Sequence, residues 1–170
     1  MLQRVSHTIE PVYSADSRVL ILGTMPSVKS REAGFYYAHP QNRFFKVLAA
    51  VLNEEMPQTT EQKKAMLLKN GIALWDVLES CDISGSSDSS ISNPKPNNIL
   101  SLVKKTRVTS VFTTGTTAYR LYTRFCEGET GIKAVCLPSP SPANAKMNFD
   151  MLLDRYRVIT DALASGENKP

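Results

Sequence analysis

The sequence predicts an α/β protein with a mostly parallel sheet that carries helices on both faces. Short apolar runs alternate with longer segments whose apolar residues recur at helical spacing. Such alternation needs crossover connections, which are right-handed and lead to parallel strand pairs. The chain of 170 residues is long enough for one hydrophobic core. We therefore expect a single domain over residues 1–170, with its core at about residues 18–163 and a short flexible tail at residues 165–170.

The first half of the chain shows two strands and two helices. RVLILG, residues 18–23, is a buried run that ends in glycine and is expected to be a strand. A helix is expected at residues 42–52, because its apolar side chains fall on one stripe. EQKKAMLLKNG, residues 61–71, is predicted to be a helix with a glycine at its end, and IALWDVL, residues 72–78, a second strand. The polar segment 81–98 is predicted to be the longest loop.

The second half repeats the alternation. Strands are expected at residues 108–115 and 132–137, each a short run of β-branched and apolar residues. Helices are expected at residues 98–106, 116–126 and 148–163, the last with an apolar stripe along its whole length.

Composition excludes several classes of protein. A formal charge of +4 permits contact with a polyanion without requiring it. Cys81, Cys126 and Cys136 form no CxxC pair, so neither a disulfide framework nor a zinc site is indicated. The N-terminal residues carry no apolar signal segment, and no apolar run is long enough for a membrane span. We expect a soluble cytoplasmic protein without membrane contact, metal ion or cofactor, and the GxGxxG and P-loop motifs are missing.

Two loops are expected to meet at one cleft. Ligands of parallel sheets bind beyond the carboxyl ends of the strands. GTMPS, residues 23–27, follows the first strand, and LPSPSPANA, residues 137–145, follows the last. The alternating prolines stiffen the second loop, which could wedge between bases or could be a plain connector.

The segment GFYYAHPQNRFF, residues 34–45, combines aromatic rings, a histidine and an amide. A planar ligand such as a nucleobase needs a stacking surface and amide hydrogen bonds, which this segment offers. Two interpretations stay open, because the aromatic residues could equally be core and Asn42 could cap the helix that follows. His7, near the terminus, is interpreted as structural.

These motifs together resemble the uracil-DNA glycosylase superfamily, over about residues 19–156. ILGTMPS, GFYYAHPQNRFF, LWDV, GSSDSSI and LPSPSPANA occur in its order and spacing, and they look most like the hypoxanthine-DNA (deoxyinosine) glycosylase branch. The mismatch-specific uracil and thymine glycosylases are the nearest relatives. The resemblance implies a three-layer αβα sandwich with a central four-stranded sheet. It also implies a monomeric enzyme that flips a damaged base out of double-stranded DNA and hydrolyses its N-glycosidic bond without a cofactor.

The resemblance also implies roles for individual residues. Most of the superfamily has a water-positioning Asn or Asp where this chain has Met25, and the catalytic amide of the hypoxanthine branch matches Asn42. The base-binding residues are expected to be Tyr37, which would stack on the base, together with His39, Phe35, Tyr36, Gly23, Thr24, Met25 and Ser27. The DNA-binding residues are expected to be Pro138, Ser139, Pro140, Ser141, Asn144, Lys146 and Arg43.

Other residues and functions are weighed beside these. Asp76 and Asp88 are secondary candidates, for which capping or loop stabilisation is the competing interpretation. The basic run of residues 104–107 is interpreted as a solvated helix face. Alternative functions are a uracil or mismatch glycosylase, a non-catalytic module that binds DNA lesions, and a nucleoside hydrolase on the same scaffold.

Overall fold

Four parallel strands form the centre of the molecule, in the order β3-β2-β6-β7. The computed structural model describes residues 1–167. The strands are β2 (Val19–Gly23), β3 (Ile72–Asp76), β6 (Ser110–Thr114) and β7 (Ala134–Leu137), and all three pairings between them are parallel. The four strands predicted from the apolar runs are therefore confirmed.

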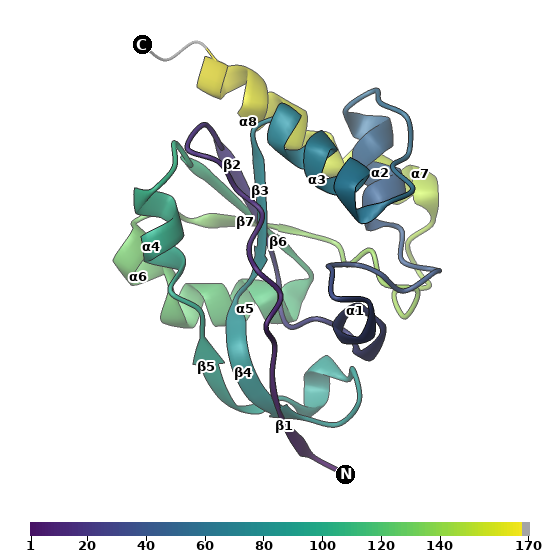
Figure 1. The fold of residues 1–170 in the computed structure, drawn as a ribbon, viewed down its shortest axis with the longest axis vertical. Helices are drawn as coiled ribbons and strands as arrows, with labels where there is room; N and C mark the ends of the chain where they lie inside the picture. The colour runs from purple at the N-terminus through teal and green to yellow at the C-terminus, as the bar shows by residue number, and fades with distance from the viewer. Residues whose placement is uncertain (168–170) are drawn as a thin grey trace.

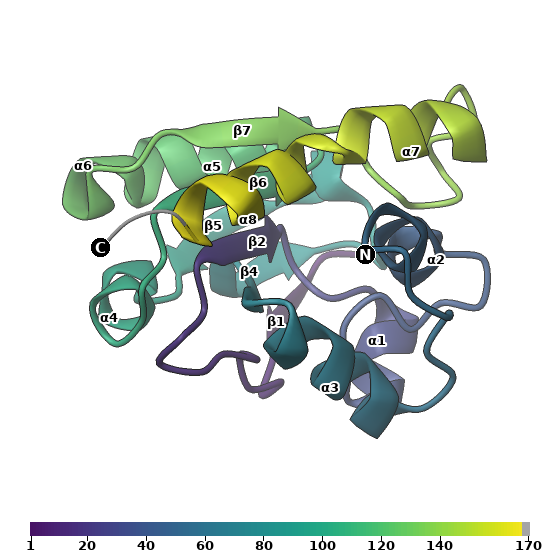
Figure 2. The same ribbon diagram turned by 90° about the horizontal axis from the view of Figure 1, so that it is seen from above.

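The sheet is covered on both faces, because successive side chains of a strand point to opposite sides. Val19 and Ile21 of β2 join one buried cluster and Leu20 and Leu22 join the other. The first cluster is completed by α2 (Phe44–Val51), α3 (Thr60–Lys69), α7 (Phe149–Tyr156) and α8 (Val158–Glu167), and the second by α4 (Ile99–Lys104) and α5 (Thr116–Phe125). Figures 1 and 2 show these helices on either side of the strands, which confirms the three-layer αβα sandwich.

A second, antiparallel sheet was not predicted. It consists of β1 (Gln3–Ser6), β4 (Leu78–Ile83) and β5 (Ser92–Pro96), in the order β1-β4-β5. The expectation of a loop over residues 81–98 is wrong, because this range holds the end of β4, the 3-10 helix η1 (Asp88–Ser90) and β5. The sequence SNPKP hides β5, since proline is tolerated only in edge strands and lowers strand propensity.

The helices depart from the prediction in four places, one of which is the short helix α6 (Glu127–Thr130), which was not predicted. α1 (Val28–Ala33) was missed, because it is short and Ser30 is its one buried residue, so no apolar periodicity marks it. The single helix predicted at residues 148–163 is two helices, separated at Arg157. Three consecutive β-branched residues follow that break, and such residues disfavour helix. α8 continues to Glu167, so the predicted tail is helical at residues 165–167, and residues 168–170 of it lie outside the described part of the chain.

α6 (Glu127–Thr130) packs beside α4 and α5 at the end of the sheet away from the cleft described below. None of the helices in residues 1–167 is long and apolar enough to cross a lipid bilayer.

Candidate active site

A cleft of about 990 Å³ opens at the carboxyl ends of all four central strands. Gly23, Asp76 and Thr114, the last residues of β2, β3 and β6, line it together with Pro138 after β7. The chain adds β3 on one side of β2 and later β6 on the other side, so the strand order reverses at β2. Ligands of parallel sheets bind at such a switch point. The predicted meeting of the loops after the first and last strands is confirmed, since both line this cleft.

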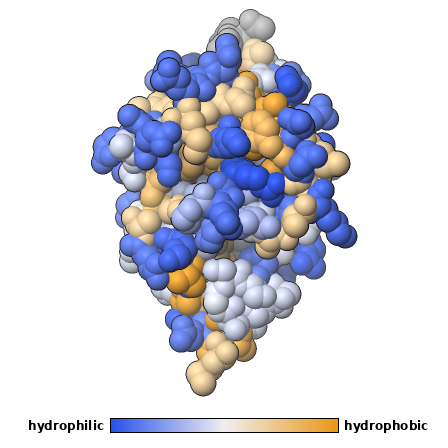
Figure 3. All heavy atoms as spheres, turned by 90° about the vertical axis from the view of Figure 1, so that its right-hand side faces the viewer, coloured by the Kyte–Doolittle hydropathy of each residue, from blue (hydrophilic) through white to orange (hydrophobic). Residues whose placement is uncertain are grey.

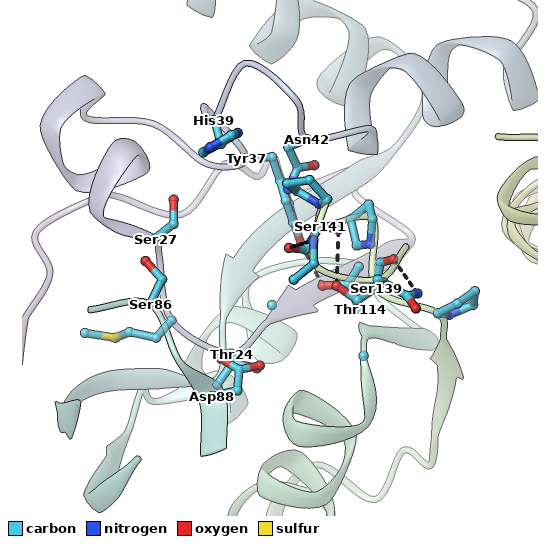
Figure 4. A pocket seen from close by; sticks show the side chains of 18 of the residues that line it. Thr24, Ser27, Tyr37, His39, Asn42, Ser86, Asp88, Thr114, Ser139 and Ser141 are labelled. Carbon is cyan, nitrogen blue, oxygen red and sulfur yellow. Dashed lines mark hydrogen bonds between the residues drawn. The ribbon is translucent and has the colours of Figure 1, made fainter. Parts of the chain in front are cut away.

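Polar side chains stand around the cleft among prolines and aromatic residues. In Figure 4, His39 and Asn42 lie on one side and Thr24 and Asp88 lie opposite. Figure 3 shows that the face carrying α1, α2 and α7 is largely hydrophilic, with hydrophobic atoms in separate small areas. A polar ligand such as a nucleic acid suits this surface better than a lipid or an apolar partner helix does.

The three consecutive aromatic residues of the sequence have different surroundings. Tyr37 lines the cleft, with its ring stacked on Phe44 at a centroid distance of 4.0 Å and its hydroxyl 2.9 Å from Thr114 Oγ1. Tyr36 also borders the cleft, but it is 2% exposed and its hydroxyl donates to the carbonyls of Ile9 and Glu10.

Phe35 does not line the cleft, contrary to the expectation that it closes the base pocket. It lies in the core, 3% exposed, where its ring packs against Tyr36 and Phe45. Tyr37 separates from its two neighbours because its backbone is left-handed, with φ of 53°. That turn sends its ring toward the cleft rather than into the core.

Asn42 and His39 are fixed at the rim of the cleft by backbone hydrogen bonds. Asn42 Oδ1 accepts from the Phe44 N–H at 2.9 Å, so the side chain caps α2 although Arg43 is the formal N-cap residue. Because an N–H can only donate, the amide oxygen must face Phe44, which leaves the NH₂ group for the cleft. His39 Nδ1 accepts from the Gln41 N–H at 3.1 Å, so its neutral ring carries the proton on Nε2.

Arg43 lies outside the cleft lining and holds the loop of residues 138–148 between β7 and α7, which we call the proline-serine loop. Its guanidinium donates to the carbonyl oxygens of four loop residues, namely Pro140, Ser141, Asn144 and Met147. Its backbone N–H also donates to the Pro140 oxygen, at 3.1 Å. With these bonds its donors face protein carbonyls, so Arg43 is placed to anchor the loop next to Asn42 rather than to contact a phosphate.

The proline-serine loop is further ordered by its own polar groups. Ser139 Oγ accepts from the Ser141 N–H, and the Asn144 side chain donates to the Ser139 carbonyl. Tyr156 Oη donates to the Pro138 carbonyl at 2.7 Å, which ties the start of the loop to α7. Pro140, Ser141 and exposed Lys146 also line the cleft.

The loop after β2 contributes Thr24, Met25 and Ser27 to the lining. Ser27 caps α1 by accepting from the Ser30 N–H, and Met25 packs against the core cluster beneath the cleft.

Among the other basic residues, exposed Lys46 lies over the Phe149 ring at 4.8 Å, and Lys104, Lys105 and Arg107 are exposed, as expected for a solvated face.

Asp76 is a buried acid within the cleft, 3% exposed as a residue. Its Oδ2 lies 3.9 Å from His7 Nε2, which donates to the Leu78 carbonyl at 2.9 Å. Burial, and to a smaller extent the negative charge of Asp88, raise the pKa of Asp76 to about 8. Burial lowers the pKa of His7 and outweighs the hydrogen bond to Leu78, which acts in the opposite direction. His7 and Asp76 are therefore both neutral near pH 7 and do not form an ion pair.

Several lining residues were not singled out from the sequence. Thr114 ends β6 and Gly115 follows it, at the same edge as the expected loops, so the strand-end rule would have found them. Arg155 on α7 has no motif around it and comes to the cleft only through the fold. Within residues 1–167, no three His, Cys, Asp or Glu side chains lie close enough to hold a metal ion.

The chain matches known proteins over most of its length. The family model of the uracil DNA glycosylase superfamily matches residues 10–160. A solution NMR structure of a candidate uracil DNA glycosylase from Methanosarcina acetivorans superposes with a TM-score of 0.77 and 26% identity, covering 93% of this chain and 99% of that one.

Two curated relatives are both named hypoxanthine DNA glycosylase. The protein from Methanosarcina barkeri is 33% identical over 88 residues, 51% of this chain and 56% of its own. That from Methanosarcina acetivorans is 34% identical over 92 residues, 54% of this chain and 58% of its own. The chain thus spans just over half the length of the curated relatives it matches. The resemblance drawn from the sequence motifs is confirmed by the family model, and the chain belongs to the uracil-DNA glycosylase superfamily.

Proposed function

We propose that this protein, acting as one domain, is a DNA glycosylase that hydrolyses the N-glycosidic bond of a flipped deaminated base and leaves an abasic site. Hypoxanthine, the base of deoxyinosine, is the proposed substrate. The observation that carries the proposal is the position of Asn42, whose free NH₂ group borders the same cleft as the loop of Pro138 to Pro142. The names of the two curated relatives support the choice of base.

The reaction builds negative charge on the departing base, and a fixed donor that meets this charge lowers the barrier. Asn42 is such a donor, because the Phe44 N–H holds its oxygen and thereby aims its nitrogen. The second lone pair of the same oxygen can accept from the attacking water. The protein thus needs no strong nucleophile.

Base binding is assigned to the residues around Tyr37. One face of the Tyr37 ring rests on Phe44, and because Tyr37 lines the cleft, its ring would also stack on the flipped base. His39 Nε2–H would donate to a base carbonyl such as O6 of hypoxanthine. The proline-serine loop would occupy the gap in the duplex or hold the flanking phosphates.

The substrate is tested with duplex oligonucleotides that carry one deoxyinosine, uracil, xanthine or mismatched base. Alkali converts each abasic site into a nick, and we expect the deoxyinosine strand to be cut fastest. Preferential cutting of the uracil strand would support the second candidate, a uracil glycosylase, to which the candidate enzyme from Methanosarcina acetivorans points. Lesion binding without any nick would support a non-catalytic module, for which Met25 at the usual polar position is the argument.

The role of the amide is tested with two variants of Asn42. Asn42→Ala removes both the cap and the donor, whereas Asn42→Asp keeps an oxygen for the Phe44 N–H and removes only the NH₂ group. We expect both variants to lose roughly 10² to 10³-fold in single-turnover rate, the range for one lost transition-state donor. Only Asn42→Ala should lose about 1 kcal/mol of stability with the cap. Full activity in the aspartate variant would refute the assignment.

A further inference from the structure

Asp76 is the one buried acid of the cleft, and the mechanism above does not use it. It ends β3 beside Gly23, its partner in the strand register, and its side chain is 5% exposed. A Cβ atom at position 23 would lie 2.5 Å from Asp76 Oδ1 and 3.2 Å from Tyr37 Oη. Glycine at the end of β2 therefore lets the carboxyl and the Tyr37 hydroxyl converge on one point under the proposed base.

The two oxygens of Asp76 have different surroundings. Oδ2 is buried without a hydrogen-bond partner among the described residues, and His7 Nε2, 3.9 Å away, already donates to Leu78. A negative charge on Oδ2 would thus be uncompensated, which is costly inside a protein. A proton on Oδ2 would find no acceptor either. The stable arrangement is a neutral carboxyl whose proton sits on Oδ1, next to the end of β2.

The groups that face Asp76 leave it without a counterion. His7 comes from the segment after β1, Tyr36 and Tyr37 from the loop before α2, and Asp88 from η1. Burial raises the pKa of both tyrosines and lowers that of His7, so these three side chains are uncharged near neutral pH. The charge of Asp88 opposes ionisation of Asp76.

We propose that Asp76 is the catalytic acid of this site and donates a proton to the base as the base departs. The inference rests on the proposed glycosylase function and adds to it. The C1′–N bond breaks with its electron pair going to the base, and the Oδ1 proton moves to an electron-rich atom of that base. Water forms the new bond to C1′, and its released proton returns to Asp76 directly or through solvent. The base leaves neutral, and the enzyme is restored.

The experiment measures single-turnover excision of hypoxanthine from pH 5.5 to 9.5 with the wild type and Asp76→Asn. The wild-type rate should be level in acid and fall about tenfold per pH unit above pH 8, where the acid ionises. The asparagine variant should be slower by roughly 10² to 10⁴-fold at pH 6 and should lack this alkaline fall. The base itself also ionises in this pH range. If the alkaline fall in rate persists unchanged in Asp76→Asn, the fall is due to the base, and the proposal is overturned.

A second variant keeps the test decisive if Asp76→Asn does not fold. Asp88→Asn removes the charge that helps to keep Asp76 neutral, so the alkaline fall should move to lower pH. If the alkaline fall in rate stays at the same pH in Asp88→Asn, the acid role of Asp76 is contradicted. A carboxyl with a purely structural role would produce no shift of the pH–rate profile. If the wild type excises no base at all, the proposed function fails instead, so the two failures are distinguishable.

Discussion

Replacing Asp76 by asparagine should stabilise the protein, and by more at alkaline than at mildly acidic pH. An unfolded chain ionises this carboxyl near its ordinary pKa of 3.8, whereas the folded protein holds the proton up to about pH 8. Between these values the native state binds one proton more than the unfolded state, so wild-type stability falls as the pH rises. Asparagine cannot ionise, so the variant does not lose this stability as the pH rises.

The magnitude follows from the size of the shift. One pKa unit corresponds to about 1.4 kcal/mol, so the cost is about 3 kcal/mol at pH 6 and on the order of 5 to 6 kcal/mol above pH 8. The stabilisation of Asp76→Asn should therefore grow by about 3 kcal/mol between pH 6 and pH 9. For a chain of this length, that is roughly 6 to 12 °C in Tm.

Thermal and urea unfolding of wild type and variant at pH 6, 7.5 and 9 would measure this difference. Asp154→Asn, at an exposed carboxyl on α7, is the matched control for the change of a carboxyl to an amide. Contributions of titrating groups that are distant from Asp76 cancel in the comparison. An equal effect of Asp76→Asn at the three pH values would refute the conclusion that Asp76 is protonated in the folded protein.

Two further substitutions test how the cleft is held together. Arg43→Lys cannot reproduce the bonds to four loop carbonyls, so it should cost about 1 to 3 kcal/mol of stability and weaken lesion binding while the salt dependence stays unchanged. Fluorescence anisotropy would measure DNA affinity at several salt concentrations. If the slope of log affinity against log salt concentration is reduced by about one in the variant, Arg43 contacts a phosphate instead. Gly23→Ala should cost about 1 to 3 kcal/mol in urea unfolding and abolish excision, because the new Cβ collides with Asp76. Gly128→Ala on α6 is its control, since no atom lies near that position, and equal stability of the two variants would contradict the crowding argument.

The central sheet could be predicted because its inner strands are buried on both faces and are mainly apolar, whereas the edge strand β7 is half-exposed but still a short apolar run. VLILG of β2 is buried at all five positions, and a glycine marks its end. The location of the cleft then followed from topology alone, without any knowledge of side-chain contacts. β1 and β5 escaped prediction for the opposite reason, since QRVS and SNPKP are exposed or half-buried edge strands that lack an apolar signal.

The candidate site could be predicted only in part, because roles within it depend on single backbone angles and on distant segments. Nothing in the run of Phe35 to Tyr37 indicates which ring enters the core, and the left-handed backbone at Tyr37 decides it. For Asn42, capping and cleft lining were treated as alternatives, yet one amide does both, since only its oxygen is needed for the cap. The charge state of Asp76 depends on its burial by the fold and on the charge of Asp88, neither of which a local pattern indicates.

Met25 stands where most of the superfamily has a water-positioning Asn or Asp, which would suggest a loss of catalysis. The surroundings of Met25 weaken this argument. A thioether offers no donor and only a weak acceptor, so the loop after β2 offers the cleft only the hydroxyl groups of Thr24 and Ser27 as polar side chains. The neighbouring strands on either side of β2 end in Asp76 and Thr114, and the absent side chain of Gly23 gives the Asp76 carboxyl the room that a Cβ would take. We expect the polar group that the superfamily usually has after the first strand to be replaced here by the ends of the two neighbouring strands and by the rim residue Asn42. A chain with Met25 but without Gly23 and Asp76 would have no such replacement, and for that chain we would expect loss of activity.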